Sequence, residues 1–188
     1  MKKMSFLLFA LCTSVAAFAQ TWNVDKAHAK VGFTVTHLAI SEVDGSFKKF
    51  DAKITSSKED FSDAVFEFSA DIKSVSTDND GRDGHLQKPD MFDSEKFPTL
   101  TFKSTGITKV ADKKYKLTGD LTIKGVTKSV TLDLLHMGST VNQRSGKKIA
   151  GFKASGYVKR TDFGVGNMPS MMVSEDIELR ASGEFVAQ

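Results

Sequence analysis

A chain of 188 residues is most economically one domain, long enough to bury a single sizeable core. The formal net charge is +3, and setting Lys2 and Lys3 aside leaves 24 of the 26 basic residues against 23 acidic ones. This near-neutral balance lacks the basic excess of nucleic-acid-binding domains, so no nucleic acid partner is expected.

The N-terminal segment has the pattern of a secretory signal peptide. Lys2 and Lys3 precede an apolar run over residues 4–15, and residues 17–19 form a small-x-small cleavage site. We therefore expect residues 1–19 to be removed and the mature protein to be periplasmic or secreted. The apolar run is too short to span a membrane as a helix, so no stable membrane insertion is expected.

The only cysteine lies inside this expected signal peptide. Leu11 precedes Cys12 at a position where a lipoprotein signal needs a small residue, so lipid attachment is not expected there. The mature chain, a single domain over residues 20–188, then has neither a thiol nor a disulfide. In an oxidising compartment such a protein depends on its core for stability.

Alternating apolar and polar residues predict a series of β-strands and almost no helix. The first strand covers residues 31–38 and places Val31, Phe33, Val35 and His37 on one face. The same alternation recurs in residues 43–54, 64–72, 100–104, 115–123, 130–136, 150–158 and 177–185.

Three connections in this series carry further expectations. Within residues 43–54 the apolar positions shift from odd to even, which indicates a bulge near Lys48 and Lys49. Residues 56–63 are expected to form a polar loop. Gly125 is placed to turn a tight hairpin between two strands.

Eight consecutive antiparallel strands, each with one apolar face, can close into a barrel or stack as two sheets. Because the connections are mostly short and sequential, we favour an all-β fold, an eight-stranded antiparallel up-and-down barrel. Its inward positions mix phenylalanines with alanines and glycines. Either the small residues leave room for a ligand beside the rings, or the glycines mark bends and the rings fill the core.

Residues 77–102 form the longest break in the strand series, and we expect them to be a short helical lid. Asp83 is placed to cap a helix that runs to about Lys88, where Pro89 would stop it. A lid of this kind indicates an apolar interior beneath it. Its expected apolar underside comprises Leu86, Met91, Phe92 and Phe97.

The histidines invite a metal hypothesis that their spacing does not support. His28 and His37 are an odd number of residues apart, so an unbroken strand places them on opposite faces. His85 lies in the lid and His136 in another strand. Residues 78–81 resemble the start of a calcium loop, but the later ligand positions hold unsuitable residues. No metal site is expected.

The best enzymatic candidates are Arg82, Asp83 and His85, because the sequence has no Gly-x-Ser-x-Gly motif and no cysteine in the mature chain. Each has a structural alternative. Asp83 can cap the helix, Arg82 can pair with Asp93 or a backbone carbonyl, and His85 can dock the lid. We therefore expect no catalytic residues and no enzyme activity.

The chain from Trp22 onward resembles the YceI-like family, the polyisoprenoid-binding, lipocalin-like proteins of bacterial periplasms. Ala29 and Met91 depart from the usual pattern, where a serine and an aromatic residue often stand. The most specific matching residues are Thr77, Asn79, Arg82, Asp83, His85, Leu86, Asp90, Phe92, Asp93, Phe97, Pro98, Phe102, Lys103, Ser104 and Thr105, supported by Asp25, His28, Gly119, Leu121 and Phe163.

The resemblance implies a barrel that encloses an apolar tunnel for a long isoprenoid chain, commonly in a homodimer. It implies no cofactor, with an isoprenoid lipid or quinone as the bound ligand. The expected ligand-binding residues come from inward strand positions and the lid: Phe33, Val35, His37, Phe66, Phe68, Arg82, His85, Leu86, Met91, Phe92, Phe102, Leu121, Phe152, Phe163 and Phe185.

Three functions remain open. The first is a periplasmic carrier that holds a long-chain isoprenoid or similar amphiphilic lipid without chemistry. The second is an enzyme that acts on such a lipid through Arg82, Asp83 and His85. The third is an envelope stress or interaction protein whose barrel is filled by its own side chains.

Overall fold

The computed structural model describes residues 19–188. The expected signal peptide lies outside this range apart from Ala19, and so does Cys12. Among the described residues, no helix is long and apolar enough to cross a membrane.

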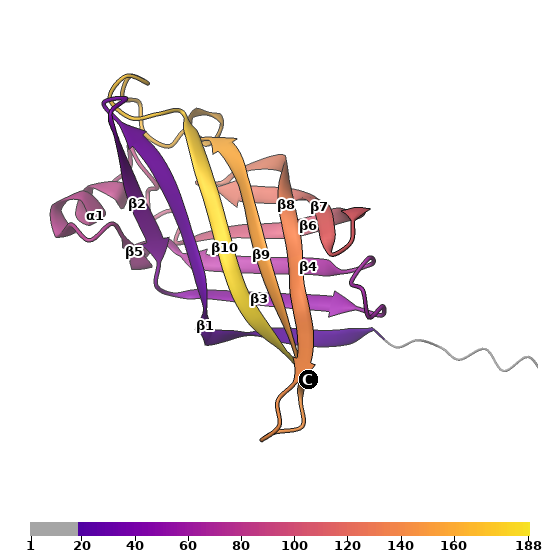
Figure 1. The fold of residues 1–188 in the computed structure, drawn as a ribbon. Coiled ribbons are helices and arrows are strands. Elements are labelled where there is room, and N and C mark those ends of the chain that lie inside the picture. The colour runs from indigo at the N-terminus through magenta and orange to yellow at the C-terminus, as the bar shows by residue number, and fades with distance from the viewer. Residues whose placement is uncertain (1–18) are drawn as a thin grey trace, which may run out of the picture.

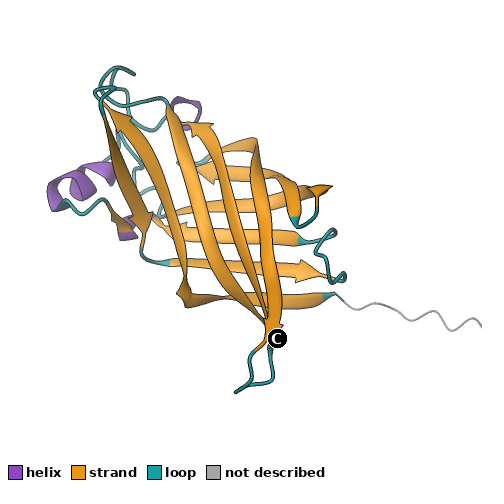
Figure 2. Cartoon of the chain, in the orientation of Figure 1, coloured by secondary structure: helices purple, strands orange, loops and turns teal. Residues whose placement is uncertain are grey.

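Within residues 19–188 the regular secondary structure is almost entirely antiparallel strand (Figures 1 and 2). The strands are β1 (Gln20–His37), β2 (Ser41–Phe47), β3 (Phe50–Ser56), β4 (Val65–Asp71), β5 (Val75–Ser76), β6 (Thr99–Ala111), β7 (Lys114–Ile123), β8 (Val126–Val141), β9 (Lys148–Lys159) and β10 (Asp176–Ala187). The helical elements are the short helix α1 (Asp80–Leu86) and two 3-10 turns, η1 (Ile72–Ser74) and η2 (Arg160–Phe163).

The sheet closes on itself as the predicted barrel. The order β10-β9-β8-β7-β6-β4-β3-β1 is completed by pairing of β10 with β1, which gives eight antiparallel strands in the described part of the chain. In Figure 1 the strands β8, β9 and β10 run steeply across β3, β4 and β6. The alternative of two separate stacked sheets is excluded, because the ladder has no open edge within the ring of eight.

The second predicted strand is divided in two. Residues 43–54 are not one bulged strand, because the chain turns at Lys48 and Lys49, whose amides donate to the backbone oxygen and hydroxyl of Ser74. The two halves pair with different parts of β1. Strand β2 pairs with residues 32–37 of β1, whereas β3 pairs with residues 20–23. Strand β1 is therefore longer than predicted, and a bulge between Asp25 and Ala29 bends it.

One end of the barrel is filled by an aromatic cluster. Phe61 lies in the expected polar loop, yet its ring is 1% exposed and packs edge-on against Trp22 and Phe152 at centroid distances of 5.2 and 5.0 Å. His136 stacks on Phe152 at 5.0 Å. Burial lowers the pKa of His136, since the charged ring would lose its hydration. The loop thus closes the barrel instead of lying on its surface.

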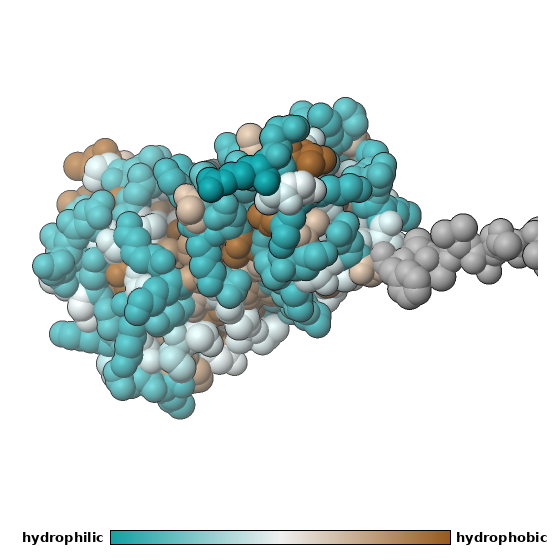
Figure 3. Space-filling model, turned by 90° about the horizontal axis from the view of Figure 1, so that it is seen from below, coloured by the Kyte–Doolittle hydropathy of each residue, from teal (hydrophilic) through white to brown (hydrophobic). Residues whose placement is uncertain are grey.

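The outer face is polar, as the strand alternation requires. Seen from below, the molecule is largely hydrophilic, and hydrophobic atoms show between the polar side chains (Figure 3). Ion pairs cross neighbouring strands on this outside, for example from Glu67 on β4 to Lys53 and Lys103 at 2.7 and 2.9 Å. Exposed pairs of this kind contribute at most about 1 kcal/mol each, so the buried apolar face accounts for most of the stability.

Candidate functional site

The barrel is hollow over the rest of its interior. A cavity of about 470 Å³ lies between the walls and the lid. Aliphatic and aromatic side chains from every strand of the ring form most of its lining, and side chains of α1 and of the loop that follows it complete it. Trp22, Phe61 and His136 are not part of the lining, so the aromatic cluster forms its floor. The barrel is filled at one end and open inside at the other.

The structure places every side chain expected in the tunnel on the wall of this one cavity. Their role in binding a ligand stays a prediction. From the strands come Phe33, Val35, His37, Phe66, Phe68, Phe102, Leu121, Phe152 and Phe185, from η2 comes Phe163, and from the lid come Arg82, His85, Leu86, Met91 and Phe92.

The glycines on the inward face do not create the space. A Cβ atom at Gly45 would lie 2.2 Å from the Phe33 ring, and one at Gly119 would lie 2.5 Å from the Phe102 ring. Those two glycines therefore accommodate neighbouring rings that lie flat on the wall. Small residues at other positions of the wall, among them Ala154 and Ala181, also line the cavity.

The lid helix begins one turn earlier than predicted. Asn79 is its N-cap, with the side-chain oxygen accepting a hydrogen bond from the amide of Arg82 at 2.9 Å, so the prediction of Asp83 as the cap is wrong. The helix also ends at Leu86, before the predicted Lys88. An asparagine four residues before Asp83 competes for the same role and has the β-region backbone that a cap requires.

Asp83 and Arg82 instead tie the helix to the chain before it. The carboxylate of Asp83 accepts from the amide and hydroxyl of buried Thr77 at 2.8 and 2.6 Å. The guanidinium of Arg82 donates to the hydroxyl and carbonyl oxygens of Thr77 at 2.7 and 2.9 Å. Of the two expected partners, Arg82 takes the backbone carbonyl, and among the described residues it forms no ion pair with Asp93.

The lid presents apolar side chains inward and polar ones at its rim. Phe92 packs edge-on against Phe47 at 6.3 Å, and Leu86 and Met91 line the cavity beside it. Phe97, expected on the same underside, lies instead against the hairpin turn at Gly125. The lid therefore covers the cavity with three of the four predicted apolar side chains.

Of the three candidate catalytic residues, His85 does not join Arg82 and Asp83. Asp83 is committed to Thr77, whereas His85 lies 3.2 Å from the carboxylate of Asp90, an exposed pair that lowers the pKa of Asp90. Arg82 and His85 do share the cavity lining with His37. These exposed polar side chains mark where the apolar interior meets solvent, which is an arrangement suited to the polar head of an amphiphile.

Arg160 is a buried residue of the cavity wall that the sequence analysis missed. It is 6% exposed, and its guanidinium donates to five backbone carbonyls, those of Val165, Gly166, Met168, Val173 and Ser174. These bonds hold residues 164–175 as an ordered loop over the end of the barrel. The sequence feature that could have indicated this burial is an arginine next to a long, apolar loop that contains two glycines and a proline.

A second polar cluster lies at the bulge of β1. His28 Nδ1 is 2.8 Å from Asp25 Oδ2 and 4.0 Å from Glu184 Oε2, and the hydrogen bond that the Asp25 carboxylate accepts raises the pKa of His28. The three side chains are close enough to share a cation. They are also partly or fully exposed, and the ion pair accounts for their arrangement.

The Asp83 network gives a direct test of the lid. Replacing Asp83 with alanine removes the acceptor for the amide and hydroxyl protons of buried Thr77, so we expect the free energy of unfolding to fall by about 1–3 kcal/mol. Hydrogen exchange should rise first in residues 77–98. Asp80→Ala, an exposed change in the same helix, is the matched control. Equal exchange in both variants would mean that Asp83 does not hold the lid.

Comparison with known proteins gives consistent matches over nearly the whole chain. The family model of the YceI-like domain matches residues 22–185. A UPF0312 protein of Staphylococcus aureus is 32% identical over 169 residues, which is 87% of this chain and 96% of the relative. A crystal structure of a Campylobacter jejuni YceI protein is 31% identical with a TM-score of 0.74, and the match covers 99% of both chains.

Two solved structures with lower identity share the fold. BcnA of Burkholderia cenocepacia is 24% identical with a TM-score of 0.77, and the match covers 88% of this chain and 99% of BcnA. A domain from Saccharophagus degradans, described as polyisoprenoid-binding and implicated in plant cell wall breakdown, is 13% identical with a TM-score of 0.63. That match covers 89% of this chain and 98% of the domain.

Proposed function

The chain belongs to the YceI-like family, and from that premise we propose that it is a periplasmic carrier of a long-chain isoprenoid or similar amphiphilic lipid. The lipid occupies the barrel cavity and undergoes no chemistry there. The description of the Saccharophagus degradans domain as polyisoprenoid-binding supports this choice of ligand class. The secretory pattern in residues 1–19 supports the periplasmic location.

The observation that carries the proposal is the large apolar cavity. The cavity has a volume of about 470 Å³ and an almost wholly apolar lining, and it opens to solvent at the lid end. Water that enters such a site finds few hydrogen-bond partners, so an apolar ligand that displaces it is favoured. Each methylene of a lipid chain that enters is worth about 0.8 kcal/mol, so an apolar chain is the favoured occupant.

The polar rim gives the ligand a direction. His37 on β1 and Arg82 and His85 in the lid line the cavity and are exposed to solvent. The floor of the cavity, by contrast, is the closed aromatic cluster. An amphiphile therefore binds with its chain toward Phe152 and its polar head toward Arg82 and His85, where a guanidinium can donate to an oxygen of the head.

No specific geometry favours the enzyme alternative, because Arg82 and Asp83 are both engaged by Thr77, whereas His85 lies against Asp90. The filled-barrel alternative describes the end that holds Trp22, Phe61 and His136. It leaves the cavity beyond them without an occupant. The carrier function accounts for both ends of the barrel.

The test is to ask what the cavity holds. The purified native protein, extracted with organic solvent and analysed by mass spectrometry, should release a long-chain lipid in near-stoichiometric amount, with an isoprenoid quinone or polyprenyl compound foremost. The lipid-free protein should melt at a lower temperature and recover when the lipid returns. A ligand at ~100 times its dissociation constant adds about 2.7 kcal/mol to the folded state.

Two controls define the ligand class. A straight-chain fatty alcohol of equal carbon number that restores the melting temperature equally would indicate a general apolar tunnel. Release of no lipid, together with no thermal shift from any apolar compound, would overturn the carrier function.

A further inference from the structure

Two loops that are distant in sequence lie side by side at one end of the barrel. The turn after β1 and the loop before β10 are joined by backbone hydrogen bonds from Leu38 to Met172 at 3.0 Å and from Ser174 to Thr36 at 2.9 Å. A β-bridge between His37 and Val173 lies between them. In Figure 1 the two loops meet at the upper end of β1 and β10. The pairing fixes both loops relative to the barrel.

This pair of loops carries four large apolar side chains in solvent. Ile40 is 85% exposed and Met171 is 80% exposed, while Leu38 and Met172 are 49% and 50% exposed. We refer to Leu38, Ile40, Met171 and Met172 as the apolar collar. Single exposed apolar residues are common on protein surfaces, but four on two joined loops form a patch that is expected to have a partner.

The backbone of the first loop runs against its residue preferences. Leu38 and Ala39 have φ angles of 51° and 57°, and the amide of Ile40 bonds to the carbonyl of His37 at 3.2 Å. A tight turn with two left-handed residues strongly favours Asn-Gly or Asp-Gly. Leucine and alanine there, followed by an exposed isoleucine, lower both folded stability and solubility. Such a choice points to a use for the apolar side chains.

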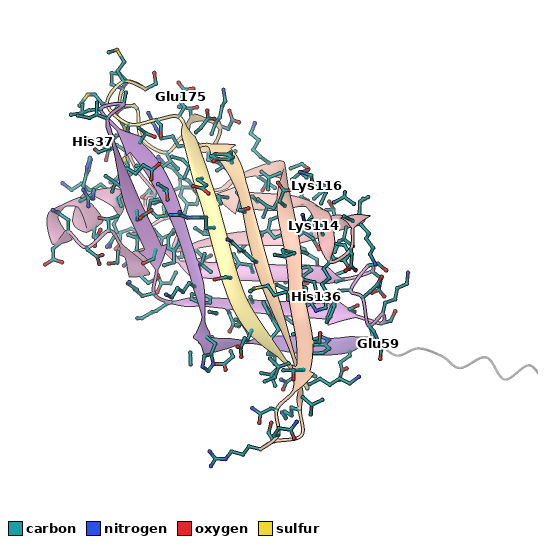
Figure 4. The ribbon with its side chains drawn as sticks, in the orientation of Figure 1. His37, Glu59, Lys114, Lys116, His136 and Glu175 are labelled. Atoms are coloured by element: carbon teal, nitrogen blue, oxygen red, sulfur yellow. The ribbon has the colours of Figure 1, made fainter. Side chains whose placement is uncertain are left out.

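The collar adjoins the cavity. His37 and Val173, the immediate neighbours of Leu38 and Met172, line the cavity, and so does Met168 in the same loop. Figure 4 shows His37 and Glu175 at this same end of the barrel, away from Glu59. The cavity therefore reaches the surface next to exposed apolar side chains, so a lipid chain that leaves it passes the collar before it meets bulk water.

We propose that the apolar collar inserts into the surface of a lipid bilayer and docks this end of the barrel there, so that the cavity exchanges its lipid directly with the membrane. The proposal rests on the lipid-carrier function. We favour a bilayer over a protein as the partner of the collar. A stable protein interface uses about 20–30 residues a side, whereas the collar has four residues on two loop tips. Loop tips of this shape penetrate a fluid apolar layer more readily than they match a flat protein surface.

The charges beside the collar define the kind of bilayer. Glu42 pairs with Thr36 across β1 and β2, and Glu175 precedes β10 at the same end. Carboxylates in these places do not attract anionic lipids. Docking therefore depends on apolar insertion, and vesicles of zwitterionic phosphatidylcholine should suffice with little dependence on salt.

The experiment measures co-flotation of the lipid-free protein with phosphatidylcholine vesicles. The double variant Ile40→Glu, Met171→Glu should partition at least tenfold less than the unchanged protein. The control Val110→Glu, Tyr157→Glu alters two other exposed apolar residues, which are 56% and 70% exposed, and should partition within twofold of the unchanged protein. Melting temperatures establish that all three proteins are folded.

A second measurement separates this proposal from the function on which it rests. Each protein is given the same polyprenyl alcohol from ethanol solution, without vesicles, and its thermal shift is recorded. If the polyprenyl alcohol raises the melting temperature of every protein but the unchanged protein does not float with vesicles, the docking proposal is wrong and the carrier function still stands. No shift in any protein would overturn the carrier. Loss of a dimer in the collar variant, without flotation, would make the collar a contact between two copies of this chain and would also overturn docking.

Discussion

Replacement of Arg160 with methionine should lower the free energy of unfolding by about 3–5 kcal/mol, the largest single effect that we expect outside the aromatic cluster. The guanidinium is buried and satisfies five carbonyls, at distances between 2.6 and 3.2 Å. Methionine fills a similar volume but has no donor. Each carbonyl that remains buried without a donor adds a desolvation penalty of about 1–3 kcal/mol, limited by how far the loop can move into water.

Local and global measurements together check this expectation. Hydrogen exchange should rise first in residues 164–175 and then in the lid, because the amide of Gly166 donates to the carbonyl of Asp90 at 2.9 Å. Urea unfolding measures the total loss of unfolding free energy in the variant. Arg144→Met is the matched control, since Arg144 lies exposed in the turn between β8 and β9. The loss of unfolding free energy in Arg160→Lys should lie between the losses in Arg160→Met and Arg144→Met, because an ammonium group cannot reach five carbonyls. Equal unfolding of the Arg160 and Arg144 variants would contradict the assignment.

The barrel could be predicted because its signal is repeated. Residues 64–72 and 115–123 alternate apolar and polar side chains without interruption, and each strand in the ring buries one face. Since the period of a strand is two, the alternation also identifies which side chains face inward. For this reason the expected lining residues all lie on the cavity wall.

The errors occur where a long-range contact decides the local structure. Phe61 lies in a stretch rich in serine and acidic residues, so only its tertiary contacts with Trp22 and Phe152 reveal that it is buried. The division of residues 43–54 depends on Ser74, which is distant in sequence and takes two amides out of the ladder. Alternation within a segment carries no information about either contact.

The burial of Arg160 and the hydrogen bonds of the lid were also difficult to predict, because long-range contacts determine both. An arginine in a loop is usually solvated, and the burial of Arg160 follows from the path of residues 164–175 around it. Asp83 and Asn79 are both acceptable N-cap residues, and the choice depends on Thr77, whose burial removes its amide and hydroxyl from water. A hydrogen bond to a buried donor is stronger than the cap that Asp83 would otherwise form.

Substitution of Ala154 by phenylalanine should abolish most lipid binding without unfolding the barrel. Ala154 lies on β9, between Leu134 on β8 and Ala181 on β10, and all three line the cavity. An added phenyl ring occupies space that a lipid chain would fill and excludes about three or four methylene groups. At about 0.8 kcal/mol for each methylene, the affinity for the lipid should fall on the order of 100-fold. The free protein should be as stable as before or more so, because the ring fills a void.

The matched control is Lys153→Phe, one residue earlier on the same strand, where the side chain is exposed on the outside of the barrel. It adds the same ring and should leave the lipid content unchanged. Both variants are purified with their native lipid, and the extracted amount per protein is measured beside the melting temperature before and after lipid removal. For Ala154→Phe the amount should drop and the two melting temperatures should converge, since no ligand remains to stabilise the fold. Full lipid content in Ala154→Phe, with a folded barrel, would show that the ligand lies outside the cavity and that the hollow interior is not the binding site.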